Sequence, residues 1–199
     1  MTRWAPGHTE GLLRYRLLSL NFHVVPRSER RSVSERIRRA AGLGRSFDPD
    51  ADPSDPQLLV GFYDGDRDTG LFGAELCHGL GLRAYFLPLL PRVASPSLFD
   101  DADLLQLGQE HELCFHTATH RSAGEISAAD LDAEVRDPVR RLTAATGRTP
   151  RVAAWRGGGR FDLTNPGDAE IARLGLRFLV SNWSVEPLPG GSDQPARGA

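Results

Sequence analysis

Apolar runs that suit β-strands alternate along this chain with segments of helical pattern. The runs begin near residues 17, 58, 82, 112, 152 and 176, and the helical segments between them cover residues 32–41, 69–80, 97–107, 127–146 and 166–174. Strands that alternate with helices in this way favour a parallel sheet with right-handed crossover connections. The sequence therefore predicts an α/β fold.

Length and charge narrow the class of protein. The chain has 199 residues and a formal net charge of -2. This length fits one domain over residues 1–199, with tails expected at 1–14 and 187–199. A net charge this close to zero gives no indication of binding to nucleic acid or to an anionic membrane. Lysine is absent from the sequence, which excludes a Schiff-base lysine and a phosphate-loop lysine.

The first residues do not read as a targeting segment. Residues 1–14 lack the charged stretch and apolar run of a secretion signal, and no apolar run in the chain is long enough to cross a membrane. We therefore expect a cytoplasmic protein that acts on a small molecule.

An acidic turn follows the second apolar run. The run from Leu58 to Tyr63 ends abruptly, and Asp64 is the first acidic residue after it. A parallel barrel strand presents functional side chains at its carboxyl end. Asp-Gly turns with solvated acids are also common on protein surfaces, so Asp64 alone does not indicate a site.

Two histidines follow the strand expected over residues 112–115. His116 ends this strand, and His120 lies four positions further on. If the chain turns helical here, both imidazoles lie on one face and can bind one divalent metal. Because the carboxyl ends of barrel strands converge, we predict that Asp64 joins His116 and His120 in a metal site. Zinc suits this donor set best, and cobalt or nickel would also fit.

These motifs resemble those of the polysaccharide deacetylase family, metal-dependent esterases that remove N-acetyl groups from amino sugars. Residues 62–68 are similar to the family's Thr-Phe-Asp-Asp-Gly motif. Residues 116–120 are similar to its His-Ser/Thr-x-x-His motif, and residues 155–159 to its Arg-x-Pro-type motif. Residues 83–86 fall where the family has an Ala-Thr-Phe-Phe strand.

The resemblance runs from about Leu17 to about Trp183 and implies the family's distorted (β/α)7 barrel. Only six strands are evident in the sequence. We therefore expect an open barrel, with an unpaired edge that the C-terminal tail or a second copy in a homo-oligomer covers.

Two departures from the family pattern concern proton transfer. The first Asp of the family's Asp-Asp pair acts as general base, and Tyr63 stands at that position. The family's final Leu-x-His strand, which supplies the general acid, has no counterpart before Ala199. The metal-binding half of the family's site is therefore present in the sequence, and the acid–base half is not.

The resemblance also suggests roles for residues around the metal ligands. Arg156 matches the family arginine that pairs with the base, so we expect it near Tyr63, where a cation would favour phenolate. Tyr63 and Arg156 are therefore the candidate catalytic residues. Trp155, Trp183 and Asp66 are the candidate substrate-binding residues, although Trp183 suits a core position equally well.

Three functions fit these features. The first is metal-dependent removal of an acyl group from the nitrogen of a small amino sugar or N-acylated metabolite. The second is a non-hydrolytic reaction on a small molecule by the same scaffold. The third is a catalytically silent binding protein. We favour the first for the class of reaction, because the complete ligand set argues for use.

Overall fold

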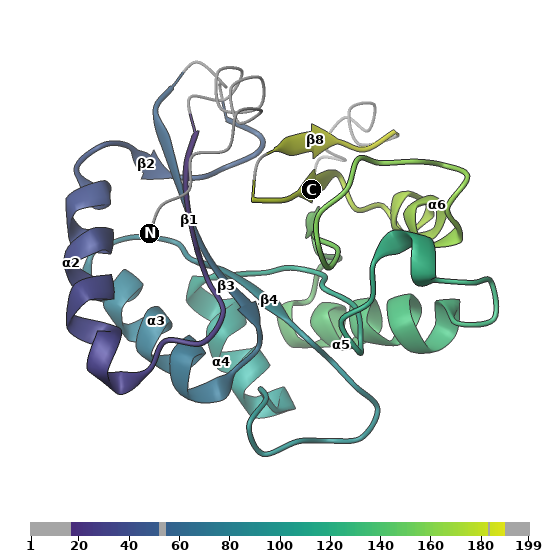
Figure 1. Ribbon diagram of the computed structural model, residues 1–199, viewed down its shortest axis with the longest axis horizontal. Helices are drawn as coiled ribbons and strands as arrows, with labels where there is room; N and C mark the ends of the chain where they lie inside the picture. The colour runs from purple at the N-terminus through teal and green to yellow at the C-terminus, as the bar shows by residue number, and fades with distance from the viewer. Residues whose placement is uncertain (1–16, 52–54, 183, 190–199) are drawn as a thin grey trace.

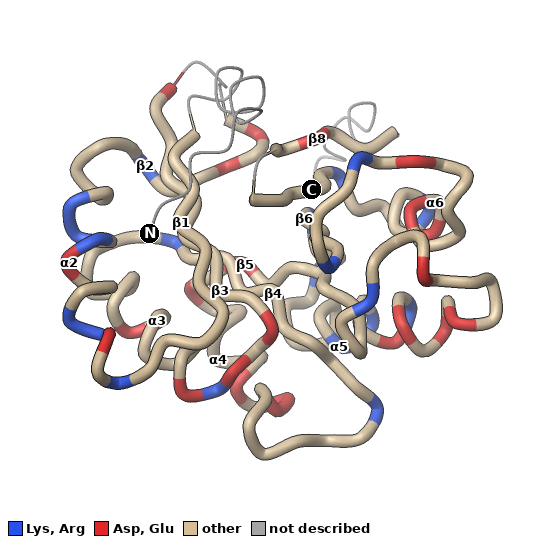
Figure 2. The backbone as a smooth tube through the Cα atoms, in the orientation of Figure 1, with Lys and Arg blue, Asp and Glu red and all other residues tan. Residues whose placement is uncertain are grey.

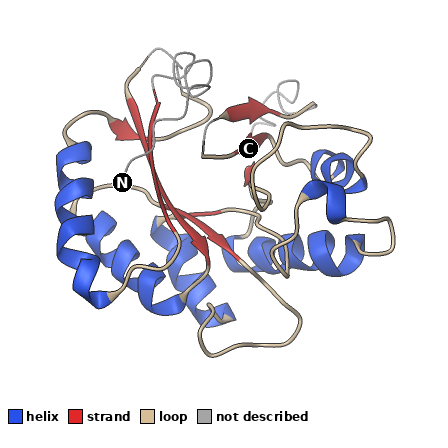
Figure 3. Ribbon diagram, viewed as in Figure 1, coloured by secondary structure: helices blue, strands red, loops and turns tan. Residues whose placement is uncertain are grey.

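The computed structural model describes residues 17–51, 55–182 and 184–189. Strands and helices alternate through most of this range, as the sequence predicts (Figures 1 and 3). The strands are β1 (Leu17–Phe22), β2 (Arg45–Ser46), β3 (Gln57–Asp64), β4 (Tyr85–Pro88), β5 (Glu112–Leu113), β6 (Val152–Ala153), β7 (Phe178–Val180) and β8 (Val185–Pro187). The helical elements are η1 (Arg27–Glu29), α2 (Arg30–Ala41), α3 (Arg67–Gly79), α4 (Asp101–Glu110), η2 (Ala123–Glu125), the π-helical turn η3 (Asp132–Arg136), α5 (Asp137–Thr146) and α6 (Pro166–Arg173).

A curved, mainly parallel sheet forms the centre of the fold. Its first part has the order β1-β3-β4-β5, and β2 pairs with the first residues of β3. A parallel bridge between Phe115 and Ala153 leads on from β5 to β6. Strand β7 is parallel to β6, and β8 is antiparallel to β7. The helices lie along the outside of this arc (Figure 1), and the α/β prediction is confirmed.

The barrel is open between its first and last strands. Among the residues that the structure describes, no strand pairing joins β1 to the sheet of β6, β7 and β8. One side-chain hydrogen bond spans the gap, in which Asn21 Nδ2 donates to Asn182 Oδ1 at 2.8 Å. This arrangement agrees with the open barrel expected from the sequence.

Two short strands were not predicted. Strand β2 lies between two segments of the expected α/β alternation, and β8 includes Pro187, where we expected the C-terminal tail to begin. The tail prediction is wrong for Leu188, which is buried and donates its backbone N–H to Arg177 O at 2.8 Å. Pairing with β7 orders this segment because Val185 and Leu188 bury apolar side chains. Residues 1–14 and 190–199 of the predicted tails lie outside the described residues.

The two faces of the sheet pack into two apolar clusters. Along β3, Leu58, Val60 and Phe62 belong to the cluster between the sheet and the helices. Leu59 and Tyr63 belong to the cluster that fills the barrel interior, because successive side chains of a strand point to opposite faces. Most charged residues lie on the surrounding helices and loops, and the central strands carry few (Figure 2). Within the described ranges, no helix has both the length and the apolar character needed to cross a lipid bilayer.

Helix α3 packs very closely on the outer face of β3. The rings of Phe22, Phe62 and Phe86 stack across three neighbouring strands, with centroids 5.4 and 5.3 Å apart. Gly73 of α3 lies directly over this row, since a Cβ atom added there would be 2.3 Å from Phe62 Cζ. This close approach fixes the helix against the strand that ends in Asp64.

We predict that Gly73→Ala destabilises the protein although alanine is the better helix former. Overpacking against the buried Phe62 ring should lower the free energy of unfolding by about 1–3 kcal/mol. Gly79→Ala, in the same helix, is the matched control. A Cβ at Gly79 meets nothing within 4 Å, so this change should raise the free energy of unfolding by up to about 1 kcal/mol. Urea denaturation of both variants is the measurement, and equal stabilisation by both would contradict the close packing.

Candidate metal centre

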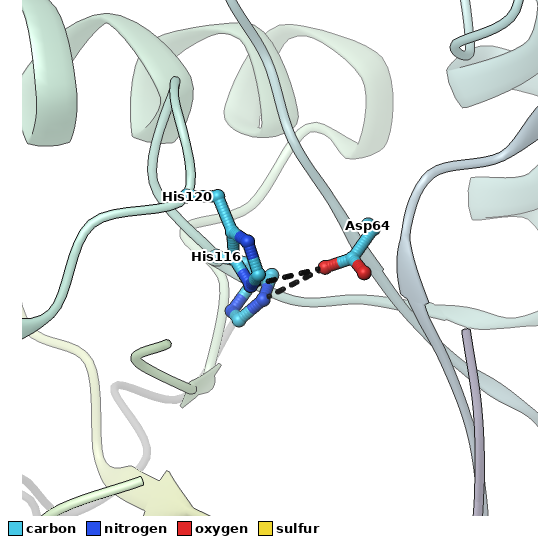
Figure 4. Close-up of side chains that lie close together, drawn as sticks. All are labelled: Asp64, His116 and His120. Carbon is cyan, nitrogen blue, oxygen red and sulfur yellow. Dashed lines mark ion pairs between the residues drawn. The ribbon is translucent and has the colours of Figure 1, made fainter. Parts of the chain in front are cut away.

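Asp64 reaches the site because β3 ends in an unusual backbone conformation. Asp64 has a φ of 66° and Gly65 a φ of 72°, so the regular alternation of side chains stops here. In a continuing strand, Tyr63 and Asp64 would point to opposite faces. The left-handed turn instead lets the Asp64 carboxylate face the two histidines that follow β5 (Figure 4).

His116 is held with one ring nitrogen directed at Asp64. The residue is 2% exposed, and its Nδ1 lies 2.8 Å from the carbonyl oxygen of Ala154. A carbonyl accepts only, so Nδ1 carries the proton and donates it in this hydrogen bond. The lone pair of the neutral ring is then on Nε2, which lies 3.3 Å from Asp64 Oδ1. A ligand imidazole in a metal site is commonly fixed in this way.

His120 reaches the same point from a loop, so the helical turn considered for residues 116–120 is not formed. Thr117 and His120 have φ values of 65° and 62°, which no right-handed helix allows. The Thr117 hydroxyl oxygen accepts the backbone N–H of His120 at 3.0 Å and stabilises this loop. His120 Nε2 lies 3.4 Å from Asp64 Oδ1, and the two imidazole centroids are 5.2 Å apart.

The three side chains fit a metal ion. One ligand atom from each of Asp64, His116 and His120 lies within 4.8 Å of the other two. Asp64 Oδ1 and His116 Nε2 are buried without a hydrogen-bond partner, since both atoms can only accept when the ring proton is on Nδ1. Ligands about 2.0–2.1 Å from a tetrahedral zinc ion lie about 3.3–3.4 Å apart. The measured separations of 3.3 and 3.4 Å match this spacing.

The electrostatics of the group favour ligand protonation states. Burial of Asp64 acts to raise its pKa, but the contacts with His116 and His23 outweigh it, and the pKa of Asp64 lies well below its usual value. Burial lowers the pKa of His120. A metal requires an ionised carboxylate and neutral imidazoles, and both shifts favour these forms.

A third imidazole lies beside the group. His23 follows β1, and its Nδ1 is 2.8 Å from Asp64 Oδ2. This contact raises the pKa of His23, and the side chain is 54% exposed. In the sequence, His23 stands at the end of the first expected strand, where a position facing the site and a structural role were both open. The structure shows that it contacts the carboxylate oxygen that does not face His116 and His120.

Tyr63 does not make the contact expected of a catalytic base. Its hydroxyl is buried with no hydrogen-bond partner. Burial, the nearby Cys114 and the charge of Asp64 raise its pKa. Arg156 contacts Glu125 instead, with Nη2 2.5 Å from Oε1. The expectation that Arg156 favours a Tyr63 phenolate is therefore wrong, because the cation is paired elsewhere and the phenol is desolvated.

The predicted substrate-binding residues have different positions. A cavity of about 120 Å³ lies beside the histidines, and Trp155 and Arg156 are among the residues that line it. Trp155 is oriented by Asp168, whose Oδ1 accepts the indole N–H at 2.8 Å. Asp66 does not line this cavity, because its carboxylate caps helix α3 by accepting the backbone N–H of Thr69 at 2.9 Å. Trp183 lies outside the described residues.

Comparison with known proteins shows where this fold occurs. No protein-family model matches the chain, and no curated protein is similar to it in sequence. Among solved structures, IcaB from Ammonifex degensii is similar with a TM-score of 0.67 and 15% identity, over 88% of each chain. The deacetylase PplD from Streptococcus pyogenes, solved with acetate, has a TM-score of 0.62 and 15% identity over 79% of each chain. A polysaccharide deacetylase from Bacillus cereus has a TM-score of 0.63 and 13% identity, over 82% of this chain and 56% of the other.

These identities are low, and the similarity lies in the path of the backbone. Asp64 ends β3, and the two histidines follow β5. These are the segments whose motifs resemble the family. The chain therefore has the fold of the polysaccharide deacetylases, the family that its Asp-Gly and His-x-x-x-His motifs resemble.

Proposed function

We propose that this chain is a metal-dependent hydrolase that removes an acyl group from the nitrogen of a small amino sugar or N-acylated metabolite. The observation that carries the proposal is the group of Asp64, His116 and His120, in which two ligand atoms are buried without a hydrogen-bond partner. The deacetylase fold supports the class of reaction. A small substrate and a cytoplasmic location stay predictions from the sequence.

The donor set favours zinc. One carboxylate oxygen and two imidazole nitrogens leave a coordination position open for chemistry, which is typical of catalytic zinc sites. The chemistry that zinc supplies at such a site is polarisation of a carbonyl oxygen and acidification of water. The chain's own residues must then hold the acyl group and move protons.

We propose that His23 moves the proton that Tyr63 was expected to move. Its ring lies against the site through the contact with Asp64 Oδ2, and imidazole is the side chain best suited to accept and release a proton near neutral pH. Tyr63 remains a neutral phenol in the barrel interior. Its ring packs edge-on against His116 at 5.5 Å and supports that ligand.

The remaining cavity residues bind the acyl group and its substituent. We propose that Trp155 forms an apolar wall, since its indole is fixed by Asp168. Arg156 lies at the cavity with 46% of its side chain exposed, so its charge can contact a polar substrate atom.

A silent binding protein is the second candidate. Among the described residues that line the cavity there is no Asp or Glu, so no carboxylate base is placed as in the family pattern. If His23 moves no proton, a ligand would bind here without being cleaved.

The first prediction of this section concerns the metal. Protein loaded with zinc and freed of excess should retain about one equivalent per chain. Asp64→Ala and His116→Ala should retain little, because each removes one ligand. His78→Ala is the control, since His78 is exposed and contacts Glu110 away from the site. Mass spectrometric metal analysis gives the answer, and a wild type without zinc would refute the metal centre.

The second prediction concerns the substrate. Zinc-loaded protein should release acetate from N-acetylated monosaccharides and should act weakly on acetylated chitin oligomers. Asp64→Asn supplies the background rate. Rapid acetate release from chitin oligomers would contradict the preference for small substrates, and ligand binding without release would favour the silent protein.

The third prediction distinguishes His23 from Tyr63. His23→Gln should lower kcat by about 10²–10⁴-fold, which is the contribution of a positioned proton-transfer group. Tyr63→Phe should leave kcat within about twofold of wild type. It should also raise the free energy of unfolding by about 1 kcal/mol, because it removes a buried hydroxyl that has no partner. Steady-state kinetics and urea denaturation measure both effects. Loss of turnover in Tyr63→Phe alone would restore the phenol as the base.

A further inference from the structure

A buried carboxylate lies behind the loop that carries the second histidine. Glu134 is 6% exposed. Its Oε2 accepts the backbone N–H groups of Ala118 and Thr119 at 3.2 and 3.1 Å, and its Oε1 accepts the Thr119 hydroxyl at 2.7 Å. All three hydrogen bonds therefore hold the segment between His116 and His120.

This segment needs such support because its backbone is strained. Thr117 and His120 are both in the left-handed region, which a residue with a Cβ atom rarely adopts and a β-branched one almost never. Such conformations persist only where surrounding contacts determine them. Thr117 Oγ1 accepts the N–H groups of His120 and Arg121 from within the loop. Glu134 supplies the support from outside it.

The helix that carries Glu134 departs from regular α-helical geometry around this residue. The sequence predicts one helix over residues 127–146, but residues 132–136 form the π-helical turn η3. Single π-turns within helices are uncommon and are frequently found at functional sites. Two adjacent residues of this turn are buried, with Val135 in the core and Glu134 against the loop.

We propose that Glu134 is a positioning residue for the metal ligand His120. Its three hydrogen bonds fix the left-handed loop that directs His120 Nε2 toward Asp64 Oδ1. The role rests on the proposed metal site, but the loop contact can be tested without metal. Groups that orient metal ligands affect metal affinity strongly, since their replacement typically weakens it about 10–100-fold.

The test compares Glu134→Met with Glu170→Met. Glu170 is a matched control, because it is 5% exposed and lies on the neighbouring helix α6. Its carboxylate contacts Arg136 and Arg173 rather than the histidine loop. Both variants lose a buried carboxylate, but only Glu134→Met frees the loop. Glu134→Gln is the conservative variant, since its amide oxygen can still accept the Ala118 and Thr119 N–H groups.

Two measurements on each protein give the outcome. In metal-free protein, amide hydrogen exchange at Ala118 and Thr119 should accelerate at least tenfold in Glu134→Met and stay near wild type in Glu170→Met. Zinc affinity, measured by chelator competition, should fall about 10–100-fold in Glu134→Met and be largely restored in Glu134→Gln.

The results separate this proposal from the proposed function. Equal exchange and equal zinc affinity in the Glu134→Met and Glu170→Met variants would overturn the positioning role. If Glu134→Met shows faster loop exchange but the wild type binds no zinc, the metal centre is refuted, and so is the role of Glu134 in positioning a metal ligand. The contact between Glu134 and the loop would still be established.

Discussion

The candidate metal site requires one carboxylate and two imidazoles to converge, although regular secondary structure would keep them apart. Asp64, Thr117 and His120 are the non-glycine residues with positive φ among those described, and all three belong to this site. Left-handed backbone at such residues is unfavourable and is typically retained where function requires it. The sheet and helices around the site supply the rigid frame against which these turns are held.

The charge distribution of the site follows from that convergence. The two carboxylate oxygens of Asp64 contact different imidazoles. Oδ1 faces His116 and His120, and Oδ2 faces His23. His116 cannot turn, because its other nitrogen is bonded to Ala154 O. Bound metal would therefore meet ligands already in place, which reduces the entropy that binding must overcome.

The sequence predicts those parts of the fold that depend on local pattern. The six strands could be found because apolar runs such as Leu58 to Tyr63 are bounded by Asp, Gly or Pro. The group of Asp64, His116 and His120 could be predicted because Asp64 ends an apolar strand and the two histidines follow a later strand in a metal-binding spacing. Short strands β2 and β8 could not, since two or three residues carry no periodicity and are ordered by the strand beside them.

Contacts between segments that are distant in the sequence could not be predicted, because local sequence pattern carries no information about them. Glu134 lies on a helix whose sequence pattern is regular, so neither its π-turn nor its contact with the loop of His120 could be predicted. Asp66 looks like a site residue because it follows Asp64 by two positions. Its carboxylate is used instead to cap α3, since the chain turns directly into that helix.

Tyr63, which stands where the resembled motif has its base, is a packing residue of the barrel interior. Its ring lies over Gly61, where an added Cβ would be 2.9 Å from Tyr63 Cε2, so the small residue and the large one are matched in the barrel interior. An ionised carboxylate at Tyr63 would stand in this apolar cluster beside the charge of Asp64, which burial and like charge both disfavour. The phenol instead fills the interior and supports the His116 ring. The proton-transfer role proposed for His23 is compatible with this packing, because His23 contacts the other carboxylate oxygen of Asp64 and its side chain is exposed.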